Sequence, residues 1–241
     1  MNIKVLASKI LSLFFPKICF FCNLPGTNLC APCKKDKFIG FVKKYCHVCN
    51  GLLRNPQVYV HQPCRKRTSL DGVFASYVLN PQLKKYISTI KYSFYTSLFS
   101  ELALDIRAAL ANRCFVYDLI TWVPLHPFRQ NWRGFNQAEL IAKAISFKAL
   151  PLLTKTQATK QQAHLTKAVR SKNLAGVFKC NSKLVNSKSI LLCDDVYTTG
   201  STLESCAFTL KKAGASKVYA YVLAQDLLKA DAAIIEALSK R

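Results

Sequence analysis

Two adjacent acids, Asp194 and Asp195, follow an apolar run and precede a loop of small hydroxyl residues, in the stretch ILLCDDVYTTGST that spans residues 190 to 202. Backbone N–H groups at the start of a following helix, together with hydroxyls and a glycine, can surround a phosphate. Carboxylates beside such a cradle would repel the phosphate unless they bound neutral hydroxyls or a Mg²⁺ ion. The pattern therefore predicts a site for a ribose 5-phosphate, with the sugar hydroxyls on the carboxylates.

The alternative interpretation is that the acids cap the following helix and the hydroxyls are ordinary turn residues. A cap needs only one acid, placed nearer the start of the helix than Asp194 or Asp195. The ligand site is therefore the favoured interpretation.

A second group of residues that could form a functional site lies near the N-terminus, where seven of the eleven cysteines fall between residues 19 and 64. They form the patterns CxxC, CxxC, CxxC and HxxC, and each such pair presents two ligands to one face of a metal ion. Two pairs complete a tetrahedral site of the kind that Zn²⁺ prefers. The predicted ligand sets are Cys19, Cys22, Cys30 and Cys33 for one zinc ion, and Cys46, Cys49, His61 and Cys64 for the other.

Disulfides are the alternative, but the chain shows no secretory signal, and three CxxC pairs are a metal spacing more than a disulfide framework. With all four positions taken by protein ligands, both zinc ions are expected to be structural. His47 is expected at the surface and outside the ligand set. The four later cysteines are expected to be small core residues; they are Cys114, Cys180, Cys193 and Cys206.

The charge of the chain predicts anionic partners, because Lys and Arg number 35 against 12 acids and give a formal net charge of +23. Nucleic acid or a polyphosphate ligand fits this excess better than a merely solvated basic surface does. No apolar run approaches the roughly 20 residues that span a bilayer. A soluble, cytoplasmic protein is therefore expected.

The elements that must position the acidic pair follow from the apolar periodicity. Strands are expected at 71–79, 119–125, 189–195 and 217–224, and helices after Asn80 and at 99–112, 135–145 and 201–215. Continuous apolar strands that alternate with amphipathic helices predict an α/β fold with a parallel sheet buried on both faces. The acidic pair would then lie at the carboxyl edge of a central strand, where open α/β sheets bind ligands. Residues 1–68 are expected to form an N-terminal helix and the double zinc module, and residues 69–241 the sheet domain.

Three segments resemble one known family. ILLCDDVYTTGST resembles the phosphoribosyl diphosphate (PRPP) signature of type I phosphoribosyltransferases, and VPLHPFRQNWRGFNQAELIA (123–142) resembles a segment of the ComF family, the competence-associated phosphoribosyltransferase-like proteins. TKQQAHLTKAVRSKNLAGVF (159–178) and the double zinc ribbon match that family too. The resemblance implies a type I phosphoribosyltransferase fold, mostly a parallel sheet flanked by helices, after a small double zinc ribbon.

The resemblance also implies roles for individual residues. Asp194 and Asp195 would hold the ribose. The polar and basic make-up of residues 155–173 independently indicates a mobile flap, in which Arg170 is the best candidate for closing on the pyrophosphate. Asp194, Asp195 and Arg170 are the candidate catalytic residues. Lys155 departs from the family, because an arginine is expected there. The remaining PRPP-binding residues implied are Leu125, His126, Arg129, Arg133, Tyr197, Thr198, Thr199, Gly200, Ser201 and Thr202.

The function implied is binding of PRPP with Mg²⁺ and support of DNA uptake in natural transformation, with single-stranded DNA and DNA-uptake proteins as partners. Whether the chain also transfers the phosphoribosyl group is left open, because no residue identifies an acceptor. Aromatic residues interleave with the arginines at 122–135 and suit stacking of single-stranded bases, although such residues are more often core. The alternative function is a metabolic phosphoribosyltransferase of nucleotide salvage.

Overall fold

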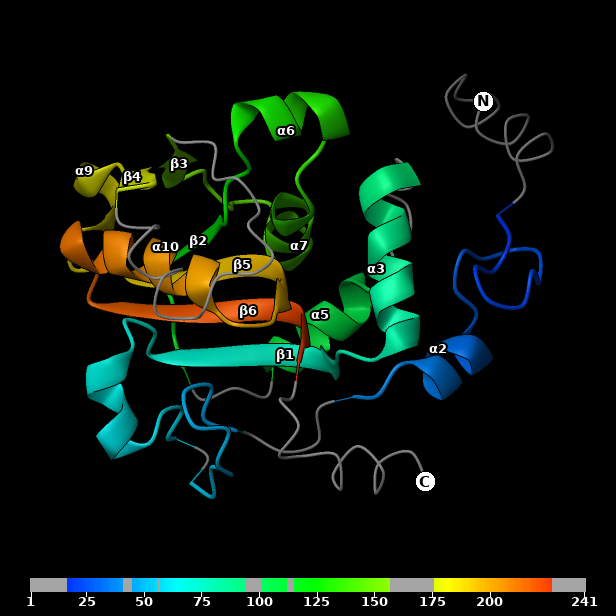
Figure 1. Cartoon of the computed structure of the whole chain (residues 1–241), viewed down its shortest axis with the longest axis horizontal. Coiled ribbons are helices and arrows are strands. Elements are labelled where there is room, and N and C mark those ends of the chain that lie inside the picture. The colour runs from blue at the N-terminus through cyan, green and yellow to red at the C-terminus, as the bar shows by residue number, and fades with distance from the viewer. Residues whose placement is uncertain are drawn as a thin grey trace.

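The computed structural model describes residues 17–40, 45–55, 57–93, 101–111, 115–156 and 176–226. Within them, four parallel strands form one sheet in the order β1, β6, β5, β2 (Figure 1). The strands of this sheet are β1 Gly72–Val78, β2 Leu119–Trp122, β5 Ser189–Tyr197 and β6 Lys217–Gln225. The prediction of a parallel sheet, with the strand that carries the acidic pair in its interior, is confirmed.

Helices cover both faces of this sheet. Helix α10 packs on one face of β5 and β6, and α5 and α7 pack together on the other (Figure 1). The helices of the sheet domain are α3 Pro81–Ser93, α5 Ala103–Ala111, α6 Pro127–Arg133, α7 Gln137–Ile145, α9 Ser182–Val185 and α10 Ser201–Lys212. Two short strands, β3 Leu153–Lys155 and β4 Phe178–Cys180, form a separate antiparallel pair. The predicted α/β fold class is therefore confirmed.

The two central strands are apolar along their length because both of their faces are buried. Residues 190–193 of β5 and 220–224 of β6 are fully buried. Strand β5 continues past the acidic pair to Tyr197, which pairs with Gln225 of β6. The expectation that the strand ends at the acids was therefore wrong by two residues, since the long partner β6 extends the ladder.

Strand β2 and helix α6 also differ from the predicted elements. Strand β2 ends at Trp122 rather than at residue 125, because Pro124 has no N–H to continue a ladder. Helix α6 begins at Pro127, and the His126 ring nitrogen Nδ1 accepts from Phe128 N at 3.3 Å. Proline at a first helical position is pre-organised for a helix, so Pro127 was a signal for a helix that was not among the predicted elements.

The cysteine-rich segment lies beside the sheet domain and includes two short helices, α2 Ala31–Lys37 and η1 Gln62–Arg67. Its first half joins the main core through Leu29 and Phe38. Its second half joins that core through Tyr59 and also has a small core of its own. No helix among the described residues is long and apolar enough to cross a bilayer. A domain boundary near residue 68 stays a prediction, and several contacts cross that position.

Candidate functional site

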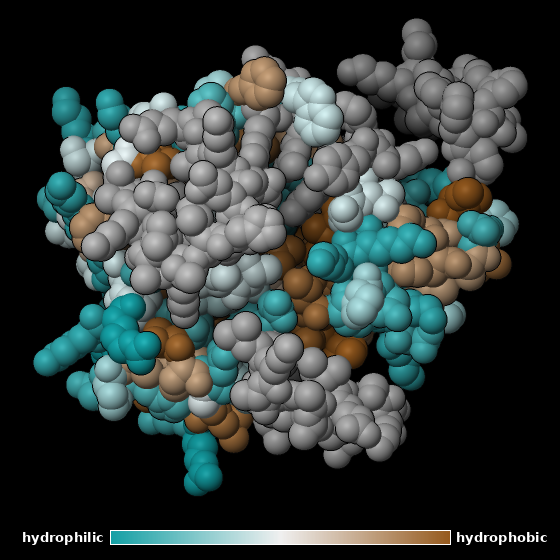
Figure 2. Space-filling view, in the orientation of Figure 1, coloured by the Kyte–Doolittle hydropathy of each residue, from teal (hydrophilic) through white to brown (hydrophobic). Residues whose placement is uncertain are grey.

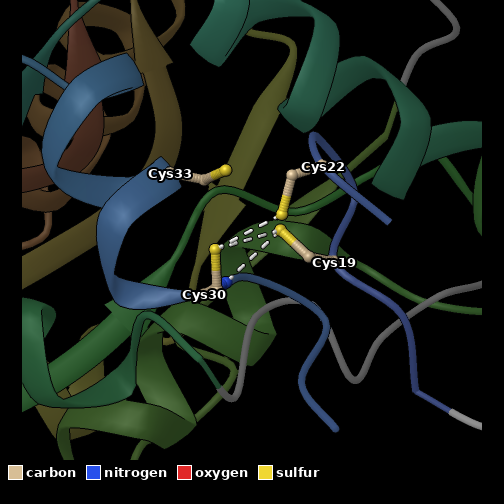
Figure 3. Close-up of side chains that lie close together, drawn as sticks. All are labelled: Cys19, Cys22, Cys30 and Cys33. Atoms are coloured by element: carbon tan, nitrogen blue, oxygen red, sulfur yellow. Dashed lines mark hydrogen bonds between the residues drawn. The ribbon is translucent and has the colours of Figure 1, made fainter. Parts of the chain in front are cut away.

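The first four predicted zinc ligands converge on one point (Figure 3). Cys19 and Cys22 come from a tight turn, and Cys30 and Cys33 from the start of α2. The Cys30 sulfur lies 3.5 Å from that of Cys19 and 3.6 Å from that of Cys22. Sulfurs around a tetrahedral zinc ion are about 3.8 Å apart, from a Zn–S bond of about 2.3 Å. The spacing therefore fits zinc, and none of these thiols is joined in a disulfide.

The protonation behaviour of these thiols also fits a cation. Burial opposes ionisation of Cys19, but N–H groups of Cys30, Cys22 and Phe21 outweigh it and lower its pKa to about 6. The Cys30 side chain, then burial, raises the pKa of Cys33 to about 12. Four crowded thiols cannot all ionise without a cation between them. Zinc would supply that positive charge and hold all four as thiolates.

The second group brings together Cys46, Cys49, His61 and Cys64, whose ligand atoms all lie within 4.8 Å of one another. The His61 nitrogen Nδ1 is 3.2 Å from the Cys49 sulfur, and Nε2 is 3.3 Å from the Leu52 carbonyl oxygen. A proton on Nε2, donated to that carbonyl, leaves the Nδ1 lone pair for a metal. Gly51 makes room for this ring, since a Cβ there would lie 2.9 Å from His61 Cε1. Both groups can therefore hold zinc.

His47 departs from its predicted surface position. Its side chain is buried, with Nε2 at 3.0 Å from the Thr68 hydroxyl, and it lies outside the four-ligand group. The expectation failed because the knuckle between Cys46 and Cys49 packs against the sheet domain. Of the later cysteines, Cys193 and Cys206 are buried as predicted, Cys180 is half-buried, and Cys114 lies outside the described residues.

A cavity of about 540 Å³ lies at the carboxyl ends of β2 and β5. Apolar side chains are visible in a recess beside the hydrophilic surface of α3 (Figure 2). The cavity is lined by Leu79, Lys84, Ile87, Ser88, Val123, Pro124, Leu125, Asn136, Gln137, Ala138, Lys155, Asp194, Asp195, Val196, Thr198 and Thr202. It occupies the edge of the sheet where the sequence places a ligand site.

The acidic pair and parts of the hydroxyl loop face this cavity together. Asp194 and Asp195 are half-buried, and Asp194 Oδ1 accepts from the Asp195 N–H at 2.9 Å. Thr198 and Thr202 line the same space, and the rest of the loop leads into α10. Asp194, Asp195, Leu125, Thr198 and Thr202 are thus brought together at one cavity.

The other candidate residues are placed differently. Thr199 and Ser201 contact each other within the loop, with 3.0 Å between their hydroxyl oxygens. His126 caps α6. Arg129 and Arg133 belong to that helix, but the structure does not describe their side chains, and Arg170 lies outside the described residues, as does most of the predicted flap.

Tyr197 does not line the cavity. Its ring is buried, and its hydroxyl donates to the His47 carbonyl oxygen at 3.3 Å. Burial, then the nearby Glu204 and Cys46 charges, raises the pKa of Tyr197 to about 12, so the hydroxyl keeps its proton. Its predicted contact with a phosphate therefore has no support from the side chain.

Several cavity residues were not singled out from the sequence. Asn136 caps α7 by accepting from Ala138 N, and its amide donates to the Val123 carbonyl oxygen at 2.9 Å. Gln137 is 3 % exposed, and its Nε2 has no hydrogen-bond partner among the described residues. The NQ pair before an apolar helix was a capping signal. Lys84 and Ser88 carried none, because only tertiary packing brings α3 to this edge.

Comparisons with known proteins agree on one family. The DNA utilization protein YhgH of Escherichia coli (strain K12) is 28 % identical over 230 residues, which cover 88 % of this chain and 98 % of that protein. The competence protein ComFC of Streptococcus pneumoniae is 38 % identical over 151 residues, covering 62 % of this chain and 66 % of that protein. Competence protein F of Haemophilus influenzae is 26 % identical over 230 residues, with coverage of 88 % and 98 %.

Family models and one solved structure give no close match to the chain. No model of a known family matches the chain. A solved structure of the allosteric regulatory enzyme of purine biosynthesis aligns with a TM-score of 0.34 and 18 % identity, over 50 % of this chain and 24 % of that one. Two of the three sequence relatives, by contrast, cover 88 % of this chain. The chain belongs to the ComF family.

Proposed function

We propose that the protein binds PRPP with Mg²⁺ in the cavity at the edge of the sheet and supports the uptake and use of DNA. The observation that carries this proposal is the meeting of Asp194, Asp195, Thr198 and Thr202 around one cavity at the carboxyl ends of the strands. Two carboxylates match the two adjacent hydroxyls of a ribose, and the hydroxyl loop at the start of a helix matches a phosphate. A single bound molecule would satisfy both.

The phosphate end of the ligand would lie on the loop before α10. This helix has 12 residues, and its N-terminal N–H groups together with its dipole favour an anion. Gly200, the N-cap, has φ of 73°, which lets its backbone approach closely. Thr198 and Thr202 would add hydroxyl donors from the cavity side.

The diphosphate end would lie between Leu125 and α7. Gln137 lines this part of the cavity, and Lys84 and Lys155 add positive charge. Asp194 and Asp195 are ligands that Mg²⁺ accepts alongside phosphate oxygens, and the ion would neutralise the diphosphate. Arg129, Arg133 and Arg170 remain proposed diphosphate contacts on the strength of the family motifs.

The role in DNA uptake rests on the relatives, whose names are DNA utilization protein, competence protein ComFC and competence protein F. The net charge of +23 provides the electrostatic attraction that a nucleic acid requires. Helix α6 adds two exposed aromatic rings one turn apart, Phe128 and Trp132, which are 77 % and 63 % exposed. Exposed rings within a basic surface are the arrangement that stacks single-stranded bases.

Calorimetric titration of PRPP with and without Mg²⁺ tests the cavity assignment. We expect saturable binding that weakens when Mg²⁺ is removed. A screen of acceptors for pyrophosphate release then separates a binding protein from an enzyme, and efficient release with one nucleobase would favour the salvage alternative. The proposal would be refuted if millimolar PRPP gave no heat of binding and did not protect the protein against unfolding.

Binding of single-stranded DNA is expected to be strongly salt-dependent and nearly independent of sequence. With about five phosphate contacts, affinity should fall roughly 100-fold between 50 and 200 mM salt, because bound counterions are released. Fluorescence anisotropy with labelled oligonucleotides measures this slope. Trp132→Ala should weaken binding at every salt concentration, while the control Phe147→Ala, which removes another exposed ring, should not. An affinity that is flat with salt would contradict the electrostatic account.

A further inference from the structure

The loop that precedes α10 lies directly on the Tyr197 ring. A Cβ built on Gly200 would lie 2.4 Å from the tyrosine oxygen and 2.5 Å from Cζ, so the backbone of Gly200 already touches the ring. Glu204 N donates to the Gly200 carbonyl oxygen at 2.8 Å and ties the loop to the first turn of α10. The position of the Tyr197 ring therefore fixes the position of the loop.

The second metal group in turn holds Tyr197. The tyrosine hydroxyl donates to the carbonyl oxygen of His47, and the two rings meet edge to face with centroids 6.2 Å apart. His47 lies between the predicted ligands Cys46 and Cys49, in a turn closed by the hydrogen bond from Asn50 N to the Cys46 carbonyl oxygen. The conformation of that turn decides where the carbonyl points.

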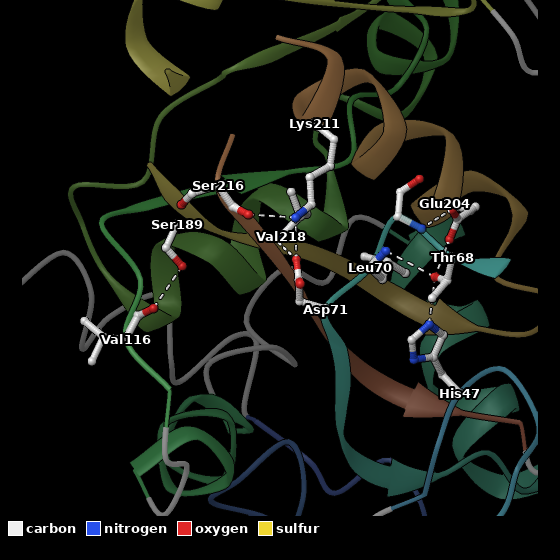
Figure 4. A network of polar contacts seen from close by, with 11 residues as sticks. His47, Thr68, Leu70, Asp71, Val116, Ser189, Glu204, Lys211, Ser216 and Val218 are labelled. Carbon is white, nitrogen blue, oxygen red and sulfur yellow. Dashed lines mark hydrogen bonds and ion pairs between the residues drawn. The ribbon is translucent and has the colours of Figure 1, made fainter. Parts of the chain in front are cut away.

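A second tether joins the same metal group to the first turn of α10. The Thr68 hydroxyl donates to Glu204 Oε2 at 2.7 Å (Figure 4). Ser69 N donates to the other carboxylate oxygen. Because its single proton goes to Glu204, the Thr68 hydroxyl accepts from His47 Nε2 at 3.0 Å and from Leu70 N at 3.1 Å. This hydroxyl is thus fully engaged between the metal group and α10.

The first metal group has different neighbours. Phe20, from its first turn, packs edge to face on Tyr86 of α3, with 5.3 Å between ring centroids. Lys34, from α2, forms an ion pair with Asp105 of α5 at 2.8 Å. These contacts support α3 and α5 rather than the loop before α10, so the two groups can be separated experimentally.

We infer that the second metal group, Cys46, Cys49, His61 and Cys64, is a positioning element for the phosphate loop, acting through Tyr197 and through Thr68 and Glu204. Loss of this group frees the loop at residues 198–202, and anion binding there weakens. The structural part stands on contacts within the chain, and the effect on PRPP rests on the proposed function. The metal group thereby couples the cysteine-rich segment to the cavity.

Hydrogen exchange of the full-length protein without ligand tests the structural part directly. In the double variant Thr68→Val/Tyr197→Phe, which leaves all eight metal ligands in place, we expect amides at 198–204 to exchange at least about tenfold faster. Zinc content should stay the same. Thr209→Val is the matched control, because its hydroxyl donates to Ser205 O within α10.

Cys64→Ser and Cys33→Ser extend the test to the metals. Each should lose about one zinc ion, but only Cys64→Ser should accelerate exchange at 198–204, while Cys33→Ser should accelerate exchange in α3. Unchanged exchange at 198–204 in the double variant overturns the inference, even if Cys64→Ser is too unstable to measure.

PRPP titration of the same proteins separates the two proposals. If the parent binds PRPP, the double variant should bind it about tenfold more weakly. If the parent does not bind PRPP while the loop still loosens, the proposed function fails and the coupling stands. If PRPP binds equally to parent and double variant, the coupling to the ligand is wrong and the proposed function stands.

Discussion

Replacing Asp194 and Asp195 together by asparagine is expected to lower the affinity for PRPP at least about tenfold, which corresponds to about 1.4 kcal/mol. Asparagine keeps the size of aspartate and part of its hydrogen bonding but removes both charges. Hydrogen bonds to a charged acceptor are about twice as strong as neutral ones, and the Mg²⁺ that accompanies the diphosphate would lose its carboxylates. Calorimetry with and without Mg²⁺ measures both effects.

The variant should keep its fold and both zinc ions, because neither acid forms part of the metal groups and both are only half-buried. Binding of single-stranded DNA should persist, since the loss of two negative charges strengthens the electrostatic attraction. Asp36→Asn is the control for removing one carboxylate, because Asp36 is exposed and does not line the cavity. Equal PRPP affinity in parent and double variant would make the acidic pair structural.

Transformation of cells that carry the double variant relates the cavity to the biological role. A strong defect, in a protein that still binds single-stranded DNA, would show that the cavity matters for DNA uptake. Normal transformation would show that handling of DNA suffices. The same variant therefore distinguishes a PRPP-dependent function from a purely DNA-binding one.

The parallel sheet, the position of the acidic pair and the two metal groups could be predicted, because each depends on residues close together in the sequence. Residues 190–193 are continuously apolar because β5 is buried on both faces. Such strands, alternating with amphipathic helices, indicated a parallel sheet. The acids at 194 and 195 then had to lie at its carboxyl edge. The metal groups followed from the spacing of paired ligands, since a CxxC turn presents both sulfurs to one side whatever surrounds it.

Contacts between segments far apart in the sequence could not be predicted, because the periodicity of apolar residues carries no information about them. His47 and Tyr197 are 150 residues apart, yet they pack together, and the histidine that the sequence placed at the surface is buried. Helix α3 forms a wall of the cavity only through packing, so Lys84 and Ser88 carried no signal. The length of β5 depended on its partner β6 rather than on its own residues.

Removal of zinc is expected to destabilise the cysteine-rich segment strongly, and the second metal group should lose more structure than the first. The buried core around the second group consists of Cys46, Leu53, Val60 and Cys64, so two of its four members are themselves metal ligands. Without the ion, the main apolar contact left to hold residues 45–64 is Tyr59, which packs on Phe74 of the main core. The first group shares the main core through Leu29 and Phe38 and should retain more structure.

Metal analysis of protein purified without chelator should find about two zinc ions per chain, and Cys46→Ser should retain about one. If the lost ion contributes about 3 kcal/mol or more to stability, Tm should fall by roughly 6 to 12 °C. Cys180→Ser is the matched control, because this half-buried thiol belongs to neither group and its variant should keep both ions. The prediction is opposed by a zinc content near zero in the parent, or by a Cys46→Ser variant that melts like the parent. Either result would mean that apolar packing alone holds the cysteine-rich segment, and the coupling of its second half to the loop before α10 would then have to operate without a metal.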